Sequence, residues 1–286
     1  MPDTFDQRFA AHFTTLSPRL REAGAYIAAN PVDTASRGLR AIAAESQMAP
    51  ATFTRLAHAL EFANFEALRE AIRAQIALKV RRFAARAGAL QHEEGGDESF
   101  LTRYRDACTA NLAALTDAVD PAQLEALVSR LGAARRVLLV GALGSFGVAT
   151  YAAYMGRFLG AGWEMAGQGG SSLASSLAGF GPQDVMLVIT KPPSARNSIR
   201  AAEAAAKSGA HVALITDSCA CPAMPHASTA FILPDDGPSF FSSYVATVFL
   251  LETVMGMVAK QAGPSVTERI ARIEAQNRLL GEVVDS

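Results

Sequence analysis

Apolar residues in the first 80 positions recur every three or four residues, and short polar turns interrupt the pattern. This spacing is typical of helices that bury one face. One helix is expected to begin at Ser17-Pro18, because Ser favours the cap and Pro tolerates the first helical position. It is expected to end at Asn30-Pro31. The pattern predicts an all-α amino-terminal domain over residues 1–80.

Two shorter helices follow, with a tight link between them. The first covers about residues 39–46, residues 47–49 form the link, and Pro50 opens the second helix. Two short helices joined by a turn of three or four residues are typical of a helix-turn-helix unit. A plain helical bundle would show the same periodicity, so the pattern alone leaves both interpretations open.

The second of these helices has one apolar face and one polar face. Its polar side would present the following residues, with the first at the margin: Thr52, Thr54, Arg55 and His58. In a major groove, Arg55 would donate to guanine or phosphate, and the two threonines would bond phosphates near the helix amino terminus.

A different pattern begins after a charged linker at residues 90–99 and a helical stretch expected over residues 100–131. Short aliphatic runs follow at residues 137–140, 185–190 and 212–216, each with a small-residue turn and an Ala-rich helical pattern behind it. Residues 230–233 are a candidate for a further strand. Strands that alternate with helices predict a parallel sheet flanked by helices.

Two apolar stretches complete this second part of the chain. Residues 244–259 contain Glu252 and are too short to span a bilayer, so we interpret them as a buried helix and expect no membrane partner. Residues 265–280 predict a last helix.

The turns after the strands are the candidate ligand site, because ligands of open α/β sheets bind beyond the carboxyl ends of the strands. The first turn contains Gly144 and Ser145, which suit an anion. Its glycine spacing differs from the dinucleotide pattern, so no nicotinamide cofactor is expected. The second turn offers its polar groups from Thr190, Lys191, Ser194 and Arg196, and Asp217 follows the third strand.

Charge and cysteine content sharpen these interpretations. The chain has a formal net charge of −1, but residues 1–90 hold 12 Lys and Arg against 8 Asp and Glu, a basic excess that favours nucleic-acid binding. The three cysteines, Cys108, Cys219 and Cys221, indicate neither a disulfide framework nor a metal site. The first residues are polar rather than signal-like, so a cytoplasmic protein is expected.

The amino-terminal segment resembles the DNA-binding domain of RpiR-type transcriptional regulators. The motifs that carry the resemblance are L-S-P, Y-I-x-x-N-P, A-T-F-T-R-L and F-x-N-F-E-A-L-R, within residues 16–72. The chain departs from the family at Gln47 and Glu61, where Gly is usual, and at Ala49, where a Ser cap is usual.

The remainder resembles a SIS (sugar isomerase) domain, over roughly residues 120–262. The matching pieces are V-G-x-x-x-S-x-x-V-A, G-P-Q-D-V-x-L-V-I-T, A-x-x-A-x-x-x-G-A-x-V-A-L-I-T-D-S and P-S-F-F-S-S. The resemblance implies phosphate contacts at Ser145 and Thr190. In the second turn, however, Pro192 and Ala195 replace two family hydroxyls, for which Lys191, Arg196 and the Ser171-Ser172 pair are the candidate substitutes.

Together these features predict a helix-turn-helix domain at residues 1–80, a linker and connecting helix at residues 81–119, and a SIS domain at residues 120–286. The resemblance implies a regulator that binds operator DNA and a phosphorylated sugar or related effector, as a homodimer or homotetramer.

Two alternatives to this function stay open from the sequence. One is a sugar-phosphate isomerase, for which Glu252 and His226 are the candidate bases. The third group considered, His211, lies before a strand and is expected to be structural or exposed. The other is a SIS body that only dimerises and binds no ligand. The attached DNA-binding segment favours a regulator, with no enzyme activity expected.

Overall fold

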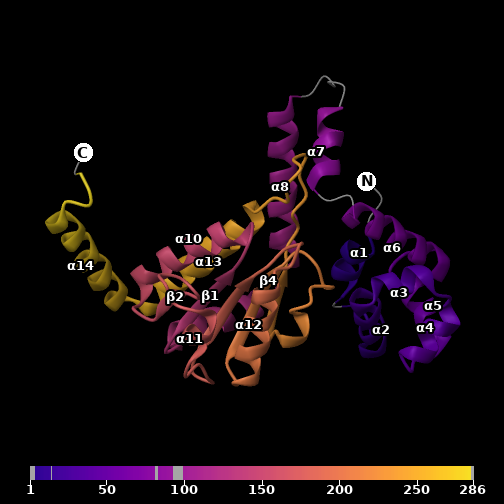
Figure 1. Cartoon of the computed structure of the whole chain (residues 1–286), viewed down its shortest axis with the longest axis horizontal. Helices are drawn as coiled ribbons and strands as arrows, with labels where there is room; N and C mark the ends of the chain where they lie inside the picture. Colours follow the sequence, from indigo (N-terminus) through magenta and orange to yellow (C-terminus); the bar gives the residue numbers. More distant parts are fainter. Residues whose placement is uncertain (1–3, 14, 81–82, 93–98, 285–286) are drawn as a thin grey trace. The chain divides into compact units, whose positions relative to one another are not determined.

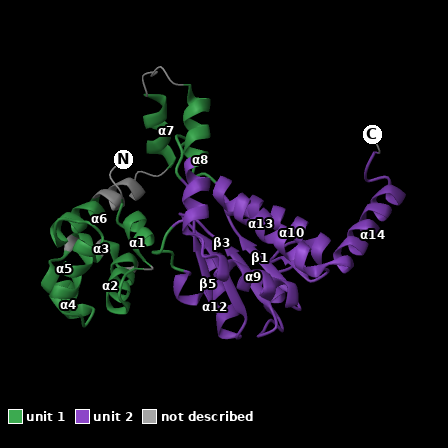
Figure 2. Ribbon diagram, turned by 180° about the vertical axis from the view of Figure 1, so that it is seen from behind, with its two compact units in different colours: residues 1–109, 218–222, 236–243 green, residues 110–217, 223–235, 244–286 purple. Residues whose placement is uncertain are grey.

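The computed structural model describes residues 4–13, 15–80, 83–92 and 99–284, and the chain forms two compact units (Figures 1 and 2). Unit 1 comprises residues 1–109 with two short later segments, 218–222 and 236–243. Unit 2 comprises residues 110–217, 223–235 and 244–286.

Unit 1 is helical, as the apolar periodicity predicts. Its helices are α1 (Phe5–His12), α2 (Pro18–Ala29), α3 (Pro31–Ser36), α4 (Leu39–Glu45), α5 (Pro50–Ala59), α6 (Phe65–Val80), α7 (Phe83–Gln91) and the first half of α8 (Phe100–Ala118). Helices α1, α3 and α7 were not predicted individually. The expected start and end of α2 are confirmed, although Ser17 occupies the cap position without a side-chain capping bond.

The core of this unit is built from large apolar side chains on successive helices. Phe9, Ile27, Phe53, Leu56 and Leu68 are each at most 1% exposed. Helix α5 packs against α2, α4 and α6, so the second helix of the expected helix-turn-helix is held on three sides. Its polar face is left to solvent.

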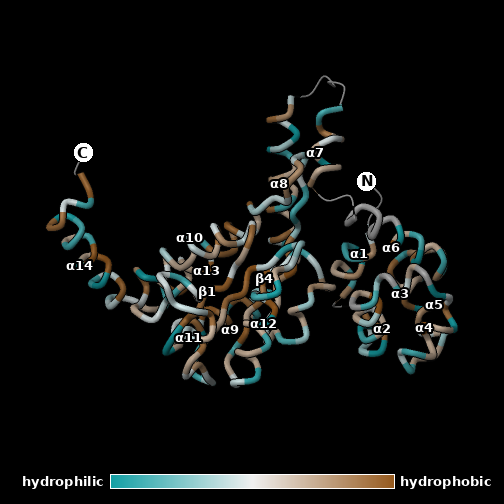
Figure 3. Tube along the Cα trace, in the orientation of Figure 1, coloured by the Kyte–Doolittle hydropathy of each residue, from teal (hydrophilic) through white to brown (hydrophobic). Residues whose placement is uncertain are grey.

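Unit 2 contains a five-stranded parallel sheet in the order β2-β1-β3-β4-β5. The strands are β1 (Val137–Gly141), β2 (Trp163–Met165), β3 (Val185–Ile189), β4 (His211–Thr216) and β5 (Thr229–Ile232). Strands β1 and β3 are buried along their whole length. Because helices cover both faces of such a strand, its sequence is apolar at every position rather than at every second one. Figure 3 shows these strands as a brown, hydrophobic centre.

Helices flank the sheet, as predicted. They are α9 (Pro121–Ala133), α10 (Ser145–Leu159), α11 (Leu173–Leu177), α12 (Arg196–Lys207), α13 (Val245–Ala262) and α14 (Pro264–Leu280), with a 3-10 turn η1 (Met224–His226). Helices α9 and α10 both contact α13, whereas α11 contacts α12. Helix α12 also packs on the middle strands β1, β3 and β4.

Two expectations about elements were wrong. The helix expected over residues 100–131 is divided into α8 and α9, because Pro121 cannot continue a helix and Asp120 caps a new one by accepting from the Ala122 N–H at 2.9 Å. Strand β2 was missed, since three residues are too short to show a pattern. The linker expected at residues 90–99 lies largely outside the described residues.

Helix α13 is long and apolar enough to pass a length-and-hydropathy test for a membrane span, the only such helix in the described part of the chain. This is weak evidence, because buried core helices pass the same test. Ala246, Leu250, Leu251 and Val254 of α13 are buried in the hydrophobic core of unit 2, as expected for the apolar stretch.

Candidate functional site

The turn between α4 and α5 has a backbone conformation that glycine usually supplies. Gln47 has φ +56°, and the Met48 N–H donates to the Ala43 carbonyl at 3.0 Å. The same arrangement ends α5, where Glu61 has φ +59° and the Phe62 N–H donates to the Ala57 carbonyl at 2.9 Å. Both are Schellman closures. They explain why glycine is usual at these two positions.

Helix α5 presents part of the polar face that the sequence predicts. Arg55 and His58 are exposed, and Thr54 is half-buried with its hydroxyl donating to the Pro50 carbonyl at 3.4 Å. Thr52 differs from expectation: it is 3% exposed, so its hydroxyl is not offered to a phosphate. The buried face of α5 is therefore wider than its apolar residues alone indicate, because it also includes Thr52.

The carboxyl end of β1 leads directly into α10, and the two approach closely. A Cβ at Gly141 would lie 2.6 Å from the Ser145 carbonyl oxygen, so only glycine fits there. Gly144 is exposed and precedes α10, and Leu143 between them has φ +54° although it is a bulky, exposed residue. Such strain in a non-glycine residue is uncommon and clusters at functional turns.

Ser145, the residue expected to bind the effector in the first turn, is 2% exposed. Its hydroxyl lies 3.0 Å from the hydroxyl of Tyr244, which precedes α13. Tyr244 was not identified from the sequence. Burial raises the pKa of the Tyr244 phenol, and the nearby carboxylates of Asp217 and Asp235 raise it further. The phenol is therefore a neutral hydrogen-bonding group at ordinary pH.

The second turn places Thr190 and Lys191 at the carboxyl end of β3, where both are buried at 3% and 5% exposure. The Lys191 ammonium lies 3.9 Å from the Asp235 carboxylate and 4.7 Å from the ring centre of Tyr244. Burial lowers the pKa of Lys191, and the charges of Asp235 and Asp217 oppose that shift. The carboxyl ends of four strands thus contribute to one cluster, which we call the rim cluster: Ser145, Lys191, Asp217, Asp235 and Tyr244.

Sequence reasoning found three members of the rim cluster and missed Asp235 and Tyr244. Asp235 follows β5 as Asp217 follows β4, and this repetition of an acid behind a strand was the available signal. Tyr244 precedes its helix by one residue and sits far along the chain from Ser145, so no local pattern connects the two.

The other residues expected in the second turn have different surroundings. Ser194 is half-buried before α12, and Arg196 is exposed in the first turn of that helix. Among the described residues, no hydrogen bond or ion pair joins Ser194 or Arg196 to the rim cluster, so their role in binding stays a prediction.

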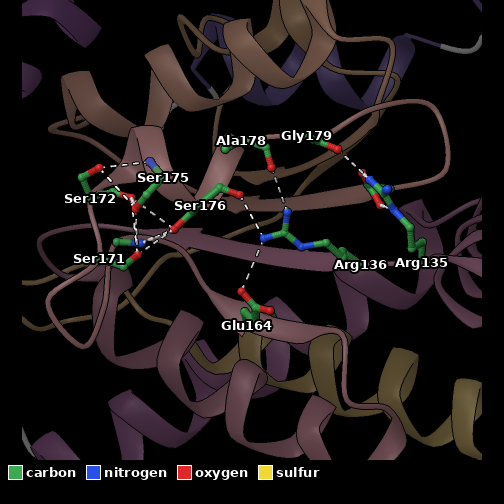
Figure 4. Close-up of polar contacts among 11 residues, drawn as sticks. Arg135, Arg136, Glu164, Ser171, Ser172, Ser175, Ser176, Ala178 and Gly179 are labelled. Atoms are coloured by element: carbon green, nitrogen blue, oxygen red, sulfur yellow. Dashed lines mark hydrogen bonds and ion pairs between the residues drawn. The ribbon is translucent and has the colours of Figure 1, made fainter.

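The Ser171-Ser172 pair, a candidate substitute for the missing hydroxyls, is engaged locally (Figure 4). Ser172 caps α11 by accepting from the Ser175 N–H at 3.0 Å, and Ser171 lies 3.2 Å from the hydroxyl of Ser176. These hydroxyls bond one another and the helix start. Their geometry supports a capping function rather than a contact with Ser145 or Thr190.

Two arginines at the amino end of β1 fix the segment before β3, as Figure 4 also shows. Arg135 pairs with the buried Asp184 through two hydrogen bonds of 2.9 and 2.5 Å, and donates to the Gly179 carbonyl at 2.7 Å. This pair holds the pKa of Asp184 below its usual value. Arg136 donates to the Ser176 carbonyl at 3.0 Å. These contacts lie at the amino ends of β1 and β3, whereas the rim cluster lies at the carboxyl ends of the strands.

The candidate bases for an isomerase lie away from the rim cluster. His226 ends η1, just before the amino end of β5, and His211 begins β4, where Thr229 bonds its ring nitrogen at 3.0 Å. Glu252 is exposed on α13 and accepts from the Tyr151 hydroxyl at 2.7 Å. Of the bases considered in the sequence, none lies at the carboxyl ends of the strands in the described part of the chain.

Comparison with known proteins agrees with this architecture. Residues 131–257 match the family model of the SIS domain. No curated protein sequence matches the chain.

Two of the solved structures that match the chain illustrate the shared fold. The first is the Vibrio vulnificus NanR protein complexed with ManNAc-6P, at 17% identity and a TM-score of 0.57, covering 97% of this chain and 99% of that one. The second is the sugar isomerase domain of an RpiR transcription factor from Sphaerobacter thermophilus, at 21% identity and a TM-score of 0.58. That match covers 62% of this chain and 99% of the other. The RpiR resemblance is therefore confirmed at the level of the fold: residues 131–257 are a SIS domain, and the chain has the fold of an RpiR-type regulator.

Proposed function

We propose that this protein is a transcriptional regulator that binds operator DNA through α5 and binds a phosphorylated sugar, or a related sugar metabolite, at the strand ends of its SIS domain. The proposed DNA binding is supported by helix α5, which packs against three other helices and exposes Arg55 and His58 to solvent. A rigidly held helix with an exposed polar face suits insertion into a major groove.

The basic excess of residues 1–90 supports the same assignment, since neutralisation of phosphates supplies most non-specific DNA affinity. Arg55 is the residue we propose for base or phosphate contact, with Thr54 and His58 beside it. Thr52 is not one of these contacts, because the residue is buried.

Fluorescence anisotropy on DNA from upstream of the gene tests the DNA half. Arg55→Ala should weaken binding by about 5- to 150-fold, the range for a lost base contact of about 1–3 kcal/mol. Lys207→Ala removes one positive charge from the exposed end of α12 and should leave affinity within about twofold. Equal losses in the two variants would show that α5 is not the recognition helix.

The effector half rests on the rim cluster, which gathers polar groups at the ends of four parallel strands where such sheets bind ligands. The amino termini of α10 and α12 also begin there, after Gly144 and Ala195. The NanR structure that shares the fold is a complex with ManNAc-6P, which supports a sugar-derived effector. We propose Gly144, Ser145, Thr190 and Lys191 as its contacts, with Ser194 and Arg196 at the entrance.

A thermal-shift screen of the full chain against sugars and sugar phosphates tests this half. A ligand at about 100 times its Kd should stabilise the protein by about 2.7 kcal/mol. Ser145→Ala should reduce the shift, whereas Ser208→Ala, at the opposite end of α12, should keep it. If no sugar or sugar phosphate stabilises the wild-type chain, effector binding is refuted.

We further propose that two copies associate so that two α5 helices read two half-sites, and that the effector shifts the population between arrangements of the pair. Analytical ultracentrifugation at micromolar concentration should give the mass of a dimer or tetramer. A monomer under those conditions would contradict this part of the proposal. The cytoplasm, where a DNA-binding regulator acts, is the proposed location.

An enzyme remains the second candidate function, because SIS domains also occur in isomerases. The positions of Glu252, His211 and His226 away from the rim cluster favour a binding protein. Turnover of an aldose or ketose phosphate by the purified chain, abolished by Ser145→Ala, would favour the isomerase instead.

A further inference from the structure

The later turns of helix α14 lie apart from the rest of unit 2. The helix begins against α10 and α13, where Val266 is 5% exposed and the Arg269 Nε donates to the Arg157 carbonyl at 2.8 Å. Figures 1 and 2 show its later turns leading away from the sheet and from the other helices of unit 2. Leu279 and Leu280, in the last turn, are 77% and 68% exposed. Because isolated helical segments shorter than about 12–15 residues are marginal in water, these turns need a packing partner.

A shallow hollow on α14 shows which side of the helix is uncovered. Its lining residues all come from α14 itself: Arg269, Arg272, Ile273, Gln276 and Asn277. No other element of the described chain closes this hollow. The half-buried Ile273 therefore borders a surface that a second helix can fill.

One face of α14 has the heptad spacing of a coiled-coil seam. Its members follow one another at alternating steps of four and three residues: Val266, Ile270, Ile273, Asn277 and Leu280. This is the spacing of the positions called a and d, which face the partner helix in a coiled coil. A seam of two heptads is too short for a free coiled coil, but here α14 is anchored to a folded unit.

The polar member of this seam indicates what kind of helix the partner is. Asn277 takes an a position, and no hydrogen bond joins its side-chain amide to another described residue. A single Asn at an a position bonds to the Asn that faces it across a parallel pair, and this bond fixes register and a two-stranded state. The partner helix therefore needs an Asn at the same place, which a second copy of α14 supplies.

The charges that flank the seam fit a second copy in parallel orientation. Arg269 precedes an a position and is at g, whereas Glu274 follows a d position and is at e. In a parallel pair, each g residue lies beside the e residue five positions later on the other helix, so Arg269 of each copy meets Glu274 of the other. An antiparallel pair joins g to g and e to e, which removes this match. The bond from Arg269 to the Arg157 carbonyl uses one of five N–H donors, so donors remain for the carboxylate.

We infer that α14 pairs with α14 of a second copy as two parallel helices in register, with the two Asn277 amides bonded to each other. This inference rests on the proposed association of two copies, and it names the surface and the orientation. The contact uses the same face of both copies, as a two-fold axis requires. The axis then runs along the helix pair.

Site-directed cross-linking of the full chain tests the pairing. In a parallel pair two thiols at an a position face each other, and a disulfide spans Cα atoms about 4.4–6.8 Å apart. Asn277→Cys should therefore convert most of the chain to a covalent dimer under mild oxidation. Ala275→Cys, exposed on the opposite side of α14, should cross-link at least about tenfold more slowly. The wild-type chain, with its three native cysteines, gives the background.

Sedimentation of the wild-type chain separates the inference from the proposed association. An oligomer that cross-links equally at positions 275 and 277, or at neither, would overturn the pairing of α14 and leave the association of two copies intact. A wild-type chain that sediments as a monomer would refute both.

Charge reversal tests the orientation of the pair. Arg269→Glu and Glu274→Arg should each weaken association by about tenfold, because each places like charges at both flanking contacts. The double variant restores opposite charges and should recover association to within about threefold of the wild type. Glu268→Arg, exposed on the outer side of α14, is the matched control and should change association by less than about twofold.

The double variant also separates pairing from the local role of Arg269. Arg269→Glu removes the bond to the Arg157 carbonyl, and that loss persists in the double variant. Recovery of association therefore reports the contact between copies alone. A double variant that keeps the helical content of the wild type and fails to recover association would overturn the parallel pairing.

Discussion

Two single residues show how closely the helix-turn-helix unit depends on backbone conformation. Gln47 and Glu61 both take positive φ at the closures of α4 and α5. Their side chains make the left-handed conformation about 1 kcal/mol less favourable than glycine would. The closures persist because the following residues, Met48 and Phe62, are buried in the helical core. Packing thus overrides local preference at both positions.

Replacing these residues with glycine should stabilise the helical unit. Gln47→Gly and Glu61→Gly should each raise the free energy of unfolding by about 0.5–1 kcal/mol, because the positive φ is then free of steric cost. Urea denaturation followed by circular dichroism measures the change. Gln47→Ala keeps the Cβ and should give no such gain. If glycine gave no more stability than alanine, the assigned backbone conformation would be wrong.

A buried carboxylate makes unit 2 sensitive to acid. Asp184 is 1% exposed, and it accepts from Arg135 and from the Gly181 N–H at 2.8 Å. Because these contacts lower its pKa in the folded state, its contribution is fully present above the unfolded value of about 3.9. The contribution is lost as the pH falls through the folded value.

Asp184→Asn should therefore cost about 2 kcal/mol of unfolding free energy at pH 7, since it removes a charge-assisted pair to a buried acceptor. The difference from the wild type should shrink as the pH falls below about 4. Denaturant titrations at several pH values measure this. Glu203→Gln, which breaks an exposed pair with Lys207, should leave the unfolding free energy almost unchanged at any pH, because solvent screens the pair. A cost for Asp184→Asn that is independent of pH would contradict the assignment.

At the scale of elements, the sequence predicts the helices and strands that have the longest apolar patterns. Four strands and the helices α2, α4, α5, α13 and α14 follow from apolar periodicity and from Pro or Ser at their starts. Short elements were missed, as were the partners of Ser145 and Lys191. Tyr244 and Asp235 reach the rim cluster only when the sheet brings distant segments together, and neither period nor spacing encodes that proximity.

Helix α10 packs on β2 through Gly156, and substitution of this glycine tests the contact between the helix and the strand. A Cβ at Gly156 would lie 2.2 Å from the ring of the buried Trp163. Gly156→Ala should lower the free energy of unfolding by about 1–3 kcal/mol through overpacking. Gly147→Ala on the same helix meets no atom within 4 Å and should stabilise by about 0.5–1 kcal/mol. Thermal denaturation compares the two, and the same sign in both would contradict this packing.

At the scale of the whole molecule, the proposed binding of operator DNA should depend steeply on salt. DNA affinity depends on released counterions, so it should fall at least tenfold between 50 and 200 mM salt. Fluorescence anisotropy in a salt titration measures this change. An affinity that stays constant over this range would contradict binding through phosphate contacts.

The strand order of unit 2 has a consequence for how the protein behaves when crowded. Its two edge strands are β2, with three residues, and β5, with four. Each edge leaves only a short row of unpaired backbone groups, while the long apolar strands β1, β3 and β4 are paired on both sides. Short edges give a neighbouring chain little to extend by strand addition. The sheet is thereby protected from edge-to-edge aggregation, even though its central strands are apolar segments of the kind that aggregate when they are exposed.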